Sequence, residues 1–327
     1  MATLRRMLAV GCLALLSVGA GPALAQDAYP SKPIRLILGF APGGISDVLG
    51  RALAVALGAN MGQQIIVENR PGAGGSLAAG HVAKSAPDGY TVWLQDMTSH
   101  AINQSLYKSL PYHPINDFTP ITLVAYSPLM LAAHPSQPTT TVKELIEYLK
   151  TNKDRRIYAS AGNGTPNHLA AELLKNLAGV SDVVHIPYKG SSPTLVALLS
   201  NEVAFSFLSM PPAVANVSAG KLRGLAVTSA KRVGAAPNVP TMIESGFPDF
   251  EIVVYTGILG PAGLPAPIVA KLNAEFAKAV AHAQVKMVYA KIGAEGITNT
   301  PQEFRAMMEK DIAKFAPMVK ASGARID

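Results

Sequence analysis

The 327-residue sequence contains one cysteine, Cys12, which lies in a segment that we expect to be cleaved off. A mature chain without thiols forms no disulfide and has neither a cysteine metal ligand nor a cysteine nucleophile. The histidines show no pair at a metal-ligand spacing such as H-E-x-x-H, and no G-x-S-x-G motif indicates a serine hydrolase. We therefore expect no metal and no cofactor.

Aromatic residues are sparse, at 6% of the chain, and the basic residues are scattered rather than grouped. Nucleic-acid binding typically needs basic clusters with aromatic residues among them, so we expect no nucleic-acid partner. The formal net charge of +7 becomes +5 if Arg5 and Arg6 are removed with the leader, which leaves 26 basic against 21 acidic residues. This mild positive field favours anionic ligands only weakly.

Residues 1–25 have the features of a secretory signal peptide. Arg5 and Arg6 form a basic start, residues 7–18 an apolar centre, and Ala23-Leu24-Ala25 a small-x-small cleavage signature. No stretch approaches the ~18 consecutive apolar residues of a membrane span. We therefore expect cleavage after Ala25 and export to the periplasm. The surroundings of Arg5-Arg6 do not support a twin-arginine signal, and too few apolar residues precede Cys12 for a lipoprotein.

Residues 34–54 indicate a strand, a glycine turn and a helix in direct succession. The apolar run 34–40 ends at Ala-Pro-Gly-Gly (41–44), and apolar residues at helical spacing follow Ser46 and Asp47. The first N–H groups of such a helix lack intrahelical partners, and the helix dipole adds positive charge there. The turn can therefore hold a carboxylate, phosphate or sulfate. The alternative is an ordinary β–α unit whose glycines only make the turn.

Similar strand–turn–helix units recur along the chain. A second glycine-rich turn, residues 70–76, lacks the third glycine of a dinucleotide fingerprint and has no Walker lysine-serine pair, so nucleotide binding is disfavoured. The strand at 157–161 ends in a turn where Thr165 is a suitable helix N-cap, and residues 183–199 repeat the pattern with a turn at 190–193. The repetition favours a parallel α/β sheet with sites at the carboxyl ends of its strands.

Two extended segments interrupt this α/β order. Residues 118–133 contain two apolar runs joined at Tyr126-Ser127-Pro128, and residues 252–260 form a second extended segment. We interpret both as crossings between two lobes, followed by closing helices at 268–281 and 302–320. Two lobes that both carry anion-binding turns indicate a clamshell that closes on a small ligand.

Several motifs occur in order over nearly the whole mature chain. They are Tyr29-Pro30-Ser31-Lys32-Pro33-Ile34, Pro42-Gly43-Gly44 with Asp47, Val67-Glu68-Asn69-Arg70-Pro71-Gly72-Ala73-Gly74-Gly75, Pro87-Asp88-Gly89-Tyr90, Ser160-Ala161-Gly162-Asn163-Gly164, Ile186-Pro187-Tyr188-Lys189-Gly190 and Gly220-Lys221-Leu222-Arg223. In this combination the sequence resembles the solute-binding proteins of tripartite tricarboxylate transporters, the Bug family.

The resemblance implies a type II periplasmic-binding-protein fold, with two Rossmann-like lobes joined by two crossing strands. One lobe comprises residues 26–125 and 253–327, and the other comprises residues 126–252. The family grips a ligand carboxylate with backbone amides and bridging waters from the first two turns. The matching positions are Phe40, Ala41, Pro42, Gly43, Gly44, Ile45, Ser46, Asp47, Gly74, Gly75, Ser76, Ala161, Gly162, Asn163, Gly164, Thr165, His168, Lys189, Ser191 and Ser209.

Three of these side chains have a second interpretation. Asp47 suits the first turn of a helix by attraction to the helix dipole, and a carboxylate facing the pocket would repel an anion. His168 is equally suited to a capping or surface position. Lys189 is either a cation for the distal group of a di-acid or a solvated lysine.

The predicted function is that of an extracytoplasmic receptor that captures a small organic carboxylate and delivers it to membrane transporter subunits. A sensor that presents the solute to a membrane kinase needs the same clamshell and stays an alternative. A periplasmic enzyme using Asp47 or His168 is a third possibility. We expect a monomer, and the sequence leaves the identity of the carboxylate open.

Overall fold

The computed structural model describes residues 29–322 and 325–326, so the predicted signal peptide lies outside the described residues. From Lys32 onward the chain forms one compact unit. None of the described helices combines the length and apolar character needed to cross a bilayer.

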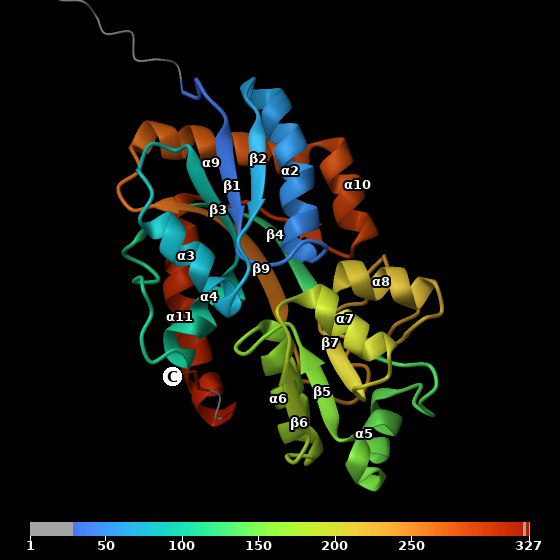
Figure 1. Ribbon diagram of the computed structural model, residues 1–327. Coiled ribbons are helices and arrows are strands. Elements are labelled where there is room, and N and C mark those ends of the chain that lie inside the picture. Colours follow the sequence, from blue (N-terminus) through green and yellow to red (C-terminus); the bar gives the residue numbers. More distant parts are fainter. Residues whose placement is uncertain (1–28, 323–324, 327) are drawn as a thin grey trace, which may run out of the picture. The chain divides into compact units, whose positions relative to one another are not determined.

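A mixed β-sheet runs through this unit (Figure 1) in the order β2-β1-β3-β9-β4-β7-β5-β6, with β8 and β10 also paired to β4. The strands are β1 (Ile34–Leu38), β2 (Ile65–Asn69), β3 (Thr91–Asp96), β4 (Phe118–Ala133), β5 (Ile157–Ser160), β6 (Val184–Pro187), β7 (Phe205–Ser209), β8 (Arg223–Val227), β9 (Val253–Pro261) and β10 (Glu295–Gly296). β1, β2 and β3 are parallel to one another, and so are β5, β6 and β7.

The helices follow the strands closely in the chain. They are α2 (Ile45–Met61), α3 (Ser76–Ala83), α4 (Met97–Leu106), α5 (Val142–Thr151), α6 (Pro166–Ala178), α7 (Ser191–Leu199), α8 (Met210–Ser218), α9 (Ala266–Ala281), α10 (Ala283–Lys291) and α11 (Pro301–Ser322), with short 3₁₀ turns at Ala73–Gly75 and Lys153–Arg155. The sequence did not predict α4 and α10. The elements that the patterns indicate are found, with ends that differ by a few residues: the strand–turn–helix units at 34–54, 157–165 and 183–199, the extended segments at 118–133 and 252–260, and the closing helices at 268–281 and 302–320.

Successive side chains of β1 point to opposite faces of the sheet, and helices cover both faces. Ile37 packs in a core with Trp93, with Ala78 of α3 and with Phe304 of α11. On the opposite face Gly50 of α2 lies against Leu38, where an added Cβ would come within 3.0 Å of a Leu38 methyl group. Glycine at that position therefore lets α2 approach β1 closely.

β4 differs from the two separate runs that the sequence suggested, because it is one strand of 16 residues. Up to Pro128 it pairs with β9, and from Leu129 onward it pairs with β7 and β8. Pro128 lies at this change of partner, opposite Val253 at the start of β9. A proline, which has no N–H, is tolerated there because no continuous ladder needs its donor.

A second core lies around the latter half of β4. Leu131 packs there with Tyr158, Phe205 and Phe207, and all four side chains are fully buried. The two cores belong to the two ends of the sheet, which share β4.

Candidate functional site

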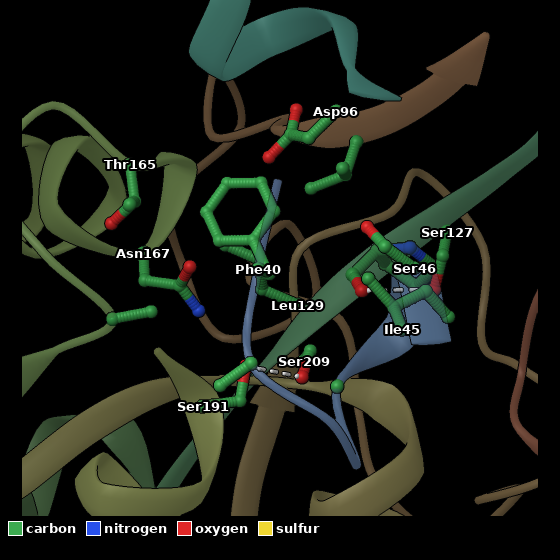
Figure 2. Close-up of a pocket in the computed structure, with 15 residues that line it drawn as sticks. Phe40, Ile45, Ser46, Asp96, Ser127, Leu129, Thr165, Asn167, Ser191 and Ser209 are labelled. Carbon is green, nitrogen blue, oxygen red and sulfur yellow. Dashed lines mark hydrogen bonds between the residues drawn. The ribbon is translucent and has the colours of Figure 1, made fainter. Parts of the chain in front are cut away.

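The N-termini of five helices meet at one cavity (Figure 2). Gly44, Asp96, Thr165 and Ser209 are the N-caps of α2, α4, α6 and α8, and Ser191 is the first residue of α7. All five line one cavity that is partly open to solvent. Its described lining residues are Phe40, Ala41, Gly44, Ile45, Ser46, Asp96, Ser127, Pro128, Leu129, Ala161, Thr165, Asn167, Ser191, Ser209 and Val254.

This convergence follows from the sheet, because each of these helices begins just after a strand whose carboxyl end lies near the middle of β4. β3 ends opposite Thr256 of β9, which itself pairs with Ala125 of β4. β7 runs in the opposite direction to β3 and ends at Ser209, opposite Leu129 of β4, so the strands of the two halves end facing each other. The N-terminal ends of helix dipoles carry partial positive charge, and the first N–H groups of each helix have no intrahelical partner. Helices from both ends of the sheet therefore direct positive potential into one space. Such an arrangement is suited to a small anion.

The five helix N-termini differ in how many backbone N–H groups they leave available to a ligand. Asp96 accepts hydrogen bonds from the Thr98 and Ser99 amides, and Thr165 accepts one from the His168 amide, so α4 and α6 are capped by side chains. In α8, Pro211 and Pro212 remove two of the first N–H groups.

The N-caps of α2 and α7 are glycines, Gly44 and Gly190, which have no side chain to cap the helix. α2 therefore offers its first amide groups to a ligand, and α7 offers those of Ser191 and Ser192, because its third residue is Pro193. Their N-termini lie close together, since a Cβ added at Gly44 would be 3.5 Å from Ser191 Oγ. Ser192 Oγ also donates to the carbonyl oxygen of Pro42 at 3.0 Å, which joins the two turns directly.

Asp47 does not line the cavity but holds the first turn in place. Gly43, whose φ is +85°, donates its N–H to Asp47 Oδ2 at 3.1 Å. Asp47 Oδ1 accepts from Arg51 Nε and Asn69 Nδ2, both at 3.1 Å. Although burial acts to raise the pKa of Asp47, the hydrogen bonds from Arg51, Gly43 and Asn69 lower it below its usual value. The carboxylate therefore shapes the turn that presents the N–H groups of α2.

The second glycine turn lines a separate cavity. This cavity shares Phe40, Ala41 and Ala161 with the first. Its other predicted residues are Gly74, Gly162, Asn163 and Lys189. Lys189 is exposed, and Asn163 is half-buried.

Gly75 and Ser76 line neither cavity. Ser76 is buried, and its hydroxyl lies 3.1 Å from Asn103 Nδ2 and 3.3 Å from the Tyr112 hydroxyl. Gly75, at φ +89°, lies against Gln95, where an added Cβ would be 2.7 Å from Nε2. Both residues therefore support the turn from behind.

His168 lies behind the turn that follows β5. Its Nδ1 accepts the Gly164 N–H at 3.2 Å, and its ring stacks on His185 with 4.2 Å between centroids. Burial lowers the pKa of His168 to about 4 and that of His185 to about 3, so both imidazoles are neutral at pH 7. Ser160 Oγ contacts His185 Nε2 at 2.6 Å and accepts the Gly162 N–H at 3.1 Å. The stacked pair therefore positions the turn from behind.

The structure thus brings nine of the twenty predicted residues to the first cavity and adds Gly74, Gly162, Asn163 and Lys189 through the second. The nine are Phe40, Ala41, Gly44, Ile45, Ser46, Ala161, Thr165, Ser191 and Ser209. It leaves Pro42, Gly43, Asp47, Gly75, Ser76, Gly164 and His168 outside both linings.

Six lining residues of the first cavity were not predicted from the sequence: Asp96, Ser127, Pro128, Leu129, Asn167 and Val254. Asp96 could have been found, because it follows the short apolar run 92–94, and an aspartate just after a strand-like run is a typical helix N-cap. Ser127 and Val254 lie on β4 and β9, where no local pattern distinguishes a cavity residue from a core residue. Asn167 Nδ2 donates to the Phe207 carbonyl at 2.7 Å, a contact 40 residues distant in sequence.

Asp96 is the only lining residue with a formal charge among those described for the first cavity. Hydroxyl and amide groups provide most of the other polar lining, from Ser46, Ser191, Ser209 and Asn167. Over residues 29–322, no cluster of three His, Cys, Asp or Glu side chains is placed to hold a metal ion.

Residues 49–324 match the tripartite tricarboxylate transporter family receptor, TctC. Protein BugT of Bordetella pertussis is 34% identical over 322 residues, which cover 98% of each chain. The UPF0065 protein in the gbd 5' region of Cupriavidus necator is 34% identical over 95% of this chain and 94% of its own.

Solved structures of similar sequence have the same fold. The periplasmic binding protein BugD is 34% identical, with a TM-score of 0.86 over 91% of this chain and 99% of its own. Rpa4515 of R. palustris, solved with adipate, is 33% identical, with a TM-score of 0.87 over 91% of this chain and 100% of its own. MatC of Rhodopseudomonas palustris, solved with bound malate, is 31% identical, with a TM-score of 0.83 over 89% of this chain and 100% of its own.

These neighbours confirm the predicted two-lobed periplasmic-binding-protein fold. They also confirm the resemblance that the sequence motifs indicated. The chain therefore belongs to the tripartite tricarboxylate transporter receptor family.

Proposed function

We propose that this protein is a periplasmic receptor that binds a small organic carboxylate between its lobes and delivers it to a membrane transporter. The observation that carries this proposal is the pair of glycine-capped helices, α2 and α7, whose N-termini meet at one cavity. Membership of a receptor family and the adipate and malate of two neighbours support a solute of this class.

In the proposed mode of binding, one ligand carboxylate accepts hydrogen bonds from the amide N–H groups at the start of α2. The same carboxylate or its neighbouring atoms also meet Ser191 and Ser209, whose hydroxyl groups lie 3.1 Å apart. Charge-assisted bonds from fixed amides stabilise an anion without a cationic side chain, which fits a first cavity that has no basic lining residue among those described.

Residues of the second cavity then take the distal part of a longer ligand. Phe40, Ala41 and Ala161 border both spaces, so a chain of several carbons would pass beside them. Lys189 is the basic residue there, and its exposed ammonium group can meet a distal carboxylate at only a modest gain in free energy.

The lobes that we propose comprise residues 26–125 with 253–327, and residues 126–252. This division is supported by β4, which takes its partners from strands on both sides of that boundary. The contact from Ser192 to Pro42 joins the two proposed lobes directly. Contacts made only in a closed state let a ligand shift the population toward that state, which a transporter can then distinguish.

An enzymatic role for Asp47 or His168 has little support. Asp47 is occupied by Gly43, Arg51 and Asn69, and His168 by the Gly164 amide and the ring of His185. Neither side chain lines a described cavity, so neither is placed to reach a bound substrate.

A thermal-shift screen tests the receptor proposal. Mature protein from Gln26 onward, refolded to remove any bound solute, is tested with mono-, di-, tri- and aromatic carboxylates and with amino acids. A ligand of the native state raises the melting temperature with its concentration. We expect one chemical series to do so. If no carboxylate shifts the melting temperature, the proposal is wrong.

Delivery to a transporter and presentation to a sensor kinase need the same binding site. Transport assays of the purified receptor with its cognate membrane subunits in vesicles distinguish them. We expect ligand uptake that depends on the receptor, whereas a sensor would leave uptake unchanged.

A further inference from the structure

Asp96 places a carboxyl group in a cavity that otherwise favours anions. It ends β3, opposite Thr256 of β9, and its side chain is buried with a relative exposure of 7%. Figure 2 shows the carboxyl group directed toward the side of the cavity where Phe40 and Thr165 lie. A negatively charged group at that position bears directly on which ligands the cavity accepts.

The described contacts of Asp96 provide no counter-charge. Oδ1 accepts the amides of Thr98 at 2.9 Å and Ser99 at 3.0 Å, and Oδ2 accepts the Ser99 hydroxyl at 2.8 Å. All three donors belong to the first turn of α4 and are neutral. Burial raises the pKa of Asp96 to about 6, despite these hydrogen bonds. The carboxyl group is therefore ionised at neutral pH without a cation among its contacts.

One acceptor site of this carboxylate has no protein donor among the described contacts. A carboxylate has about four lone-pair sites, and the three hydrogen bonds use two on Oδ1 and one on Oδ2. A buried acceptor of this kind is stabilised when a ligand supplies a donor. A second ligand carboxylate at the same place would instead set two anions side by side in a medium of low dielectric constant.

We propose that Asp96 determines ligand specificity by accepting a hydrogen bond from a hydroxyl or ammonium group of the bound solute. The preferred solutes are then hydroxy- or amino-substituted carboxylic acids, whose carboxylate occupies the N-termini of α2 and α7 while the substituent meets Asp96. This inference rests on the proposed receptor function and adds the chemical class of its ligand.

Three four-carbon acids that differ in a single substituent test it. Succinate carries hydrogen, malate a hydroxyl and aspartate an ammonium group at the same carbon. Titration calorimetry at pH 7.5 gives the dissociation constant of each for the mature protein. We expect malate or aspartate to bind about 10-fold or more tightly than succinate, the usual effect of one hydrogen bond to a charged group.

Asp96→Asn separates the charge from the structural role, because asparagine caps a helix as well as aspartate does. If the substituent is an ammonium group, the variant loses the preference for aspartate. If it is a hydroxyl, the asparagine NH2 group, which replaces Oδ2 while the carbonyl caps α4, can donate to that hydroxyl, and the preference for malate falls by a smaller factor. Asp249→Asn removes the charge of an exposed aspartate outside the cavities and should change neither preference.

Equal affinity of the wild-type protein for all three acids would overturn the inference and leave the receptor proposal standing. An Asp96→Asn variant that keeps the full wild-type preference would do the same. If none of the three acids binds while another carboxylate does, the inference is also wrong. Binding of no carboxylate of any class contradicts the proposed function itself.

Discussion

At the scale of single residues, the site separates groups that face the cavity from groups that hold its turns. Asp47 and His168 have the chemistry of ligand contacts, yet each is directed to a backbone N–H group, of Gly43 and Gly164 respectively. Asp96 has the same helix-capping geometry but faces the cavity. Residue type alone therefore does not decide which carboxylate or imidazole meets the ligand.

The raised pKa of Asp96 predicts a gain in stability on its neutralisation. An acid with a folded-state pKa of about 6, above its usual 3.8, disfavours the ionised native state at neutral pH. Asp96→Asn removes this cost and should raise the free energy of unfolding at pH 7.5 by roughly 1–3 kcal/mol. The lost attraction to the dipole of α4, about 0.3–1 kcal/mol, offsets part of this gain.

Urea denaturation of both proteins at pH 7.5 and pH 4 measures this effect. The gain should vanish near pH 4, where the wild-type carboxyl group is protonated in the folded state. A variant that is less stable than the wild-type protein at pH 7.5 would show that the charge of Asp96 stabilises the fold.

The buried pair of His168 and His185 predicts a loss of stability in acid. Their folded-state pKa values, about 4 and 3, lie below the ordinary value of 6.5, so the unfolded chain takes up protons first as the pH falls. The stability that neutral imidazoles contribute is therefore present above pH 6.5 and is lost progressively between pH 6.5 and pH 4.

His168→Asn tests this contribution, because the asparagine oxygen can accept the Gly164 N–H but does not titrate. We expect the free energy of unfolding of the variant to fall less steeply between pH 6.5 and pH 4, by roughly 1–3 kcal/mol over that range. His134→Asn, a change at a half-buried histidine outside this pair, serves as the control. Equal slopes for wild type and His168→Asn would contradict the assignment.

At the scale of elements, the start of α2 is the main feature of the proposed binding mode. Proline is tolerated at the first helical position, and Gly44 before it is extended, at φ −82° and ψ 178°, as a residue before proline requires. Ile45→Pro should therefore keep the helix and remove one amide donor from the cavity.

We expect Ile45→Pro to weaken carboxylate binding about 10-fold, the usual effect of a lost hydrogen bond to a charged group, with little change in melting temperature. Ile45→Ala controls for the altered side chain, because it keeps the N–H group. Titration calorimetry of both variants measures the difference. Equal affinities for the proline and alanine variants would exclude this amide from the binding mode.

Elements also show what could be predicted from the sequence. The Pro-Gly-Gly turn before α2 and the Gly-x-Gly-Thr turn before α6 carry local signals, and both lie at the cavity as the patterns indicated. α4 was missed because Thr98, Ser99 and Asn103 have weak helical propensity. Its stability comes from the Asp96 cap and from packing on α11, which is about 200 residues away in the chain.

The cavity residues that lie on strands could not be predicted from local sequence patterns, because they too depend on contacts distant in the chain. Ser127 and Val254 come together only because β4 and β9 pair in one antiparallel register. That register is set by both strands together, so neither segment alone reveals which of its residues borders a cavity.

At the scale of the whole molecule, closure predicts a change in compactness. Ser192 and Pro42 make a direct contact between the proposed lobes, which indicates a closed arrangement of these lobes. Small-angle scattering of the mature protein should show a smaller radius of gyration with a saturating ligand than without it. The same radius with every carboxylate that binds would contradict a clamshell mechanism.

The most direct test of the account is a crystal structure of the mature protein with the best carboxylate from the thermal-shift screen. The account predicts a ligand carboxylate within hydrogen-bond distance of the amide nitrogens at residues 44–46, between the N-termini of α2 and α7. A ligand bound elsewhere, or one whose carboxylate points away from α2, would contradict it.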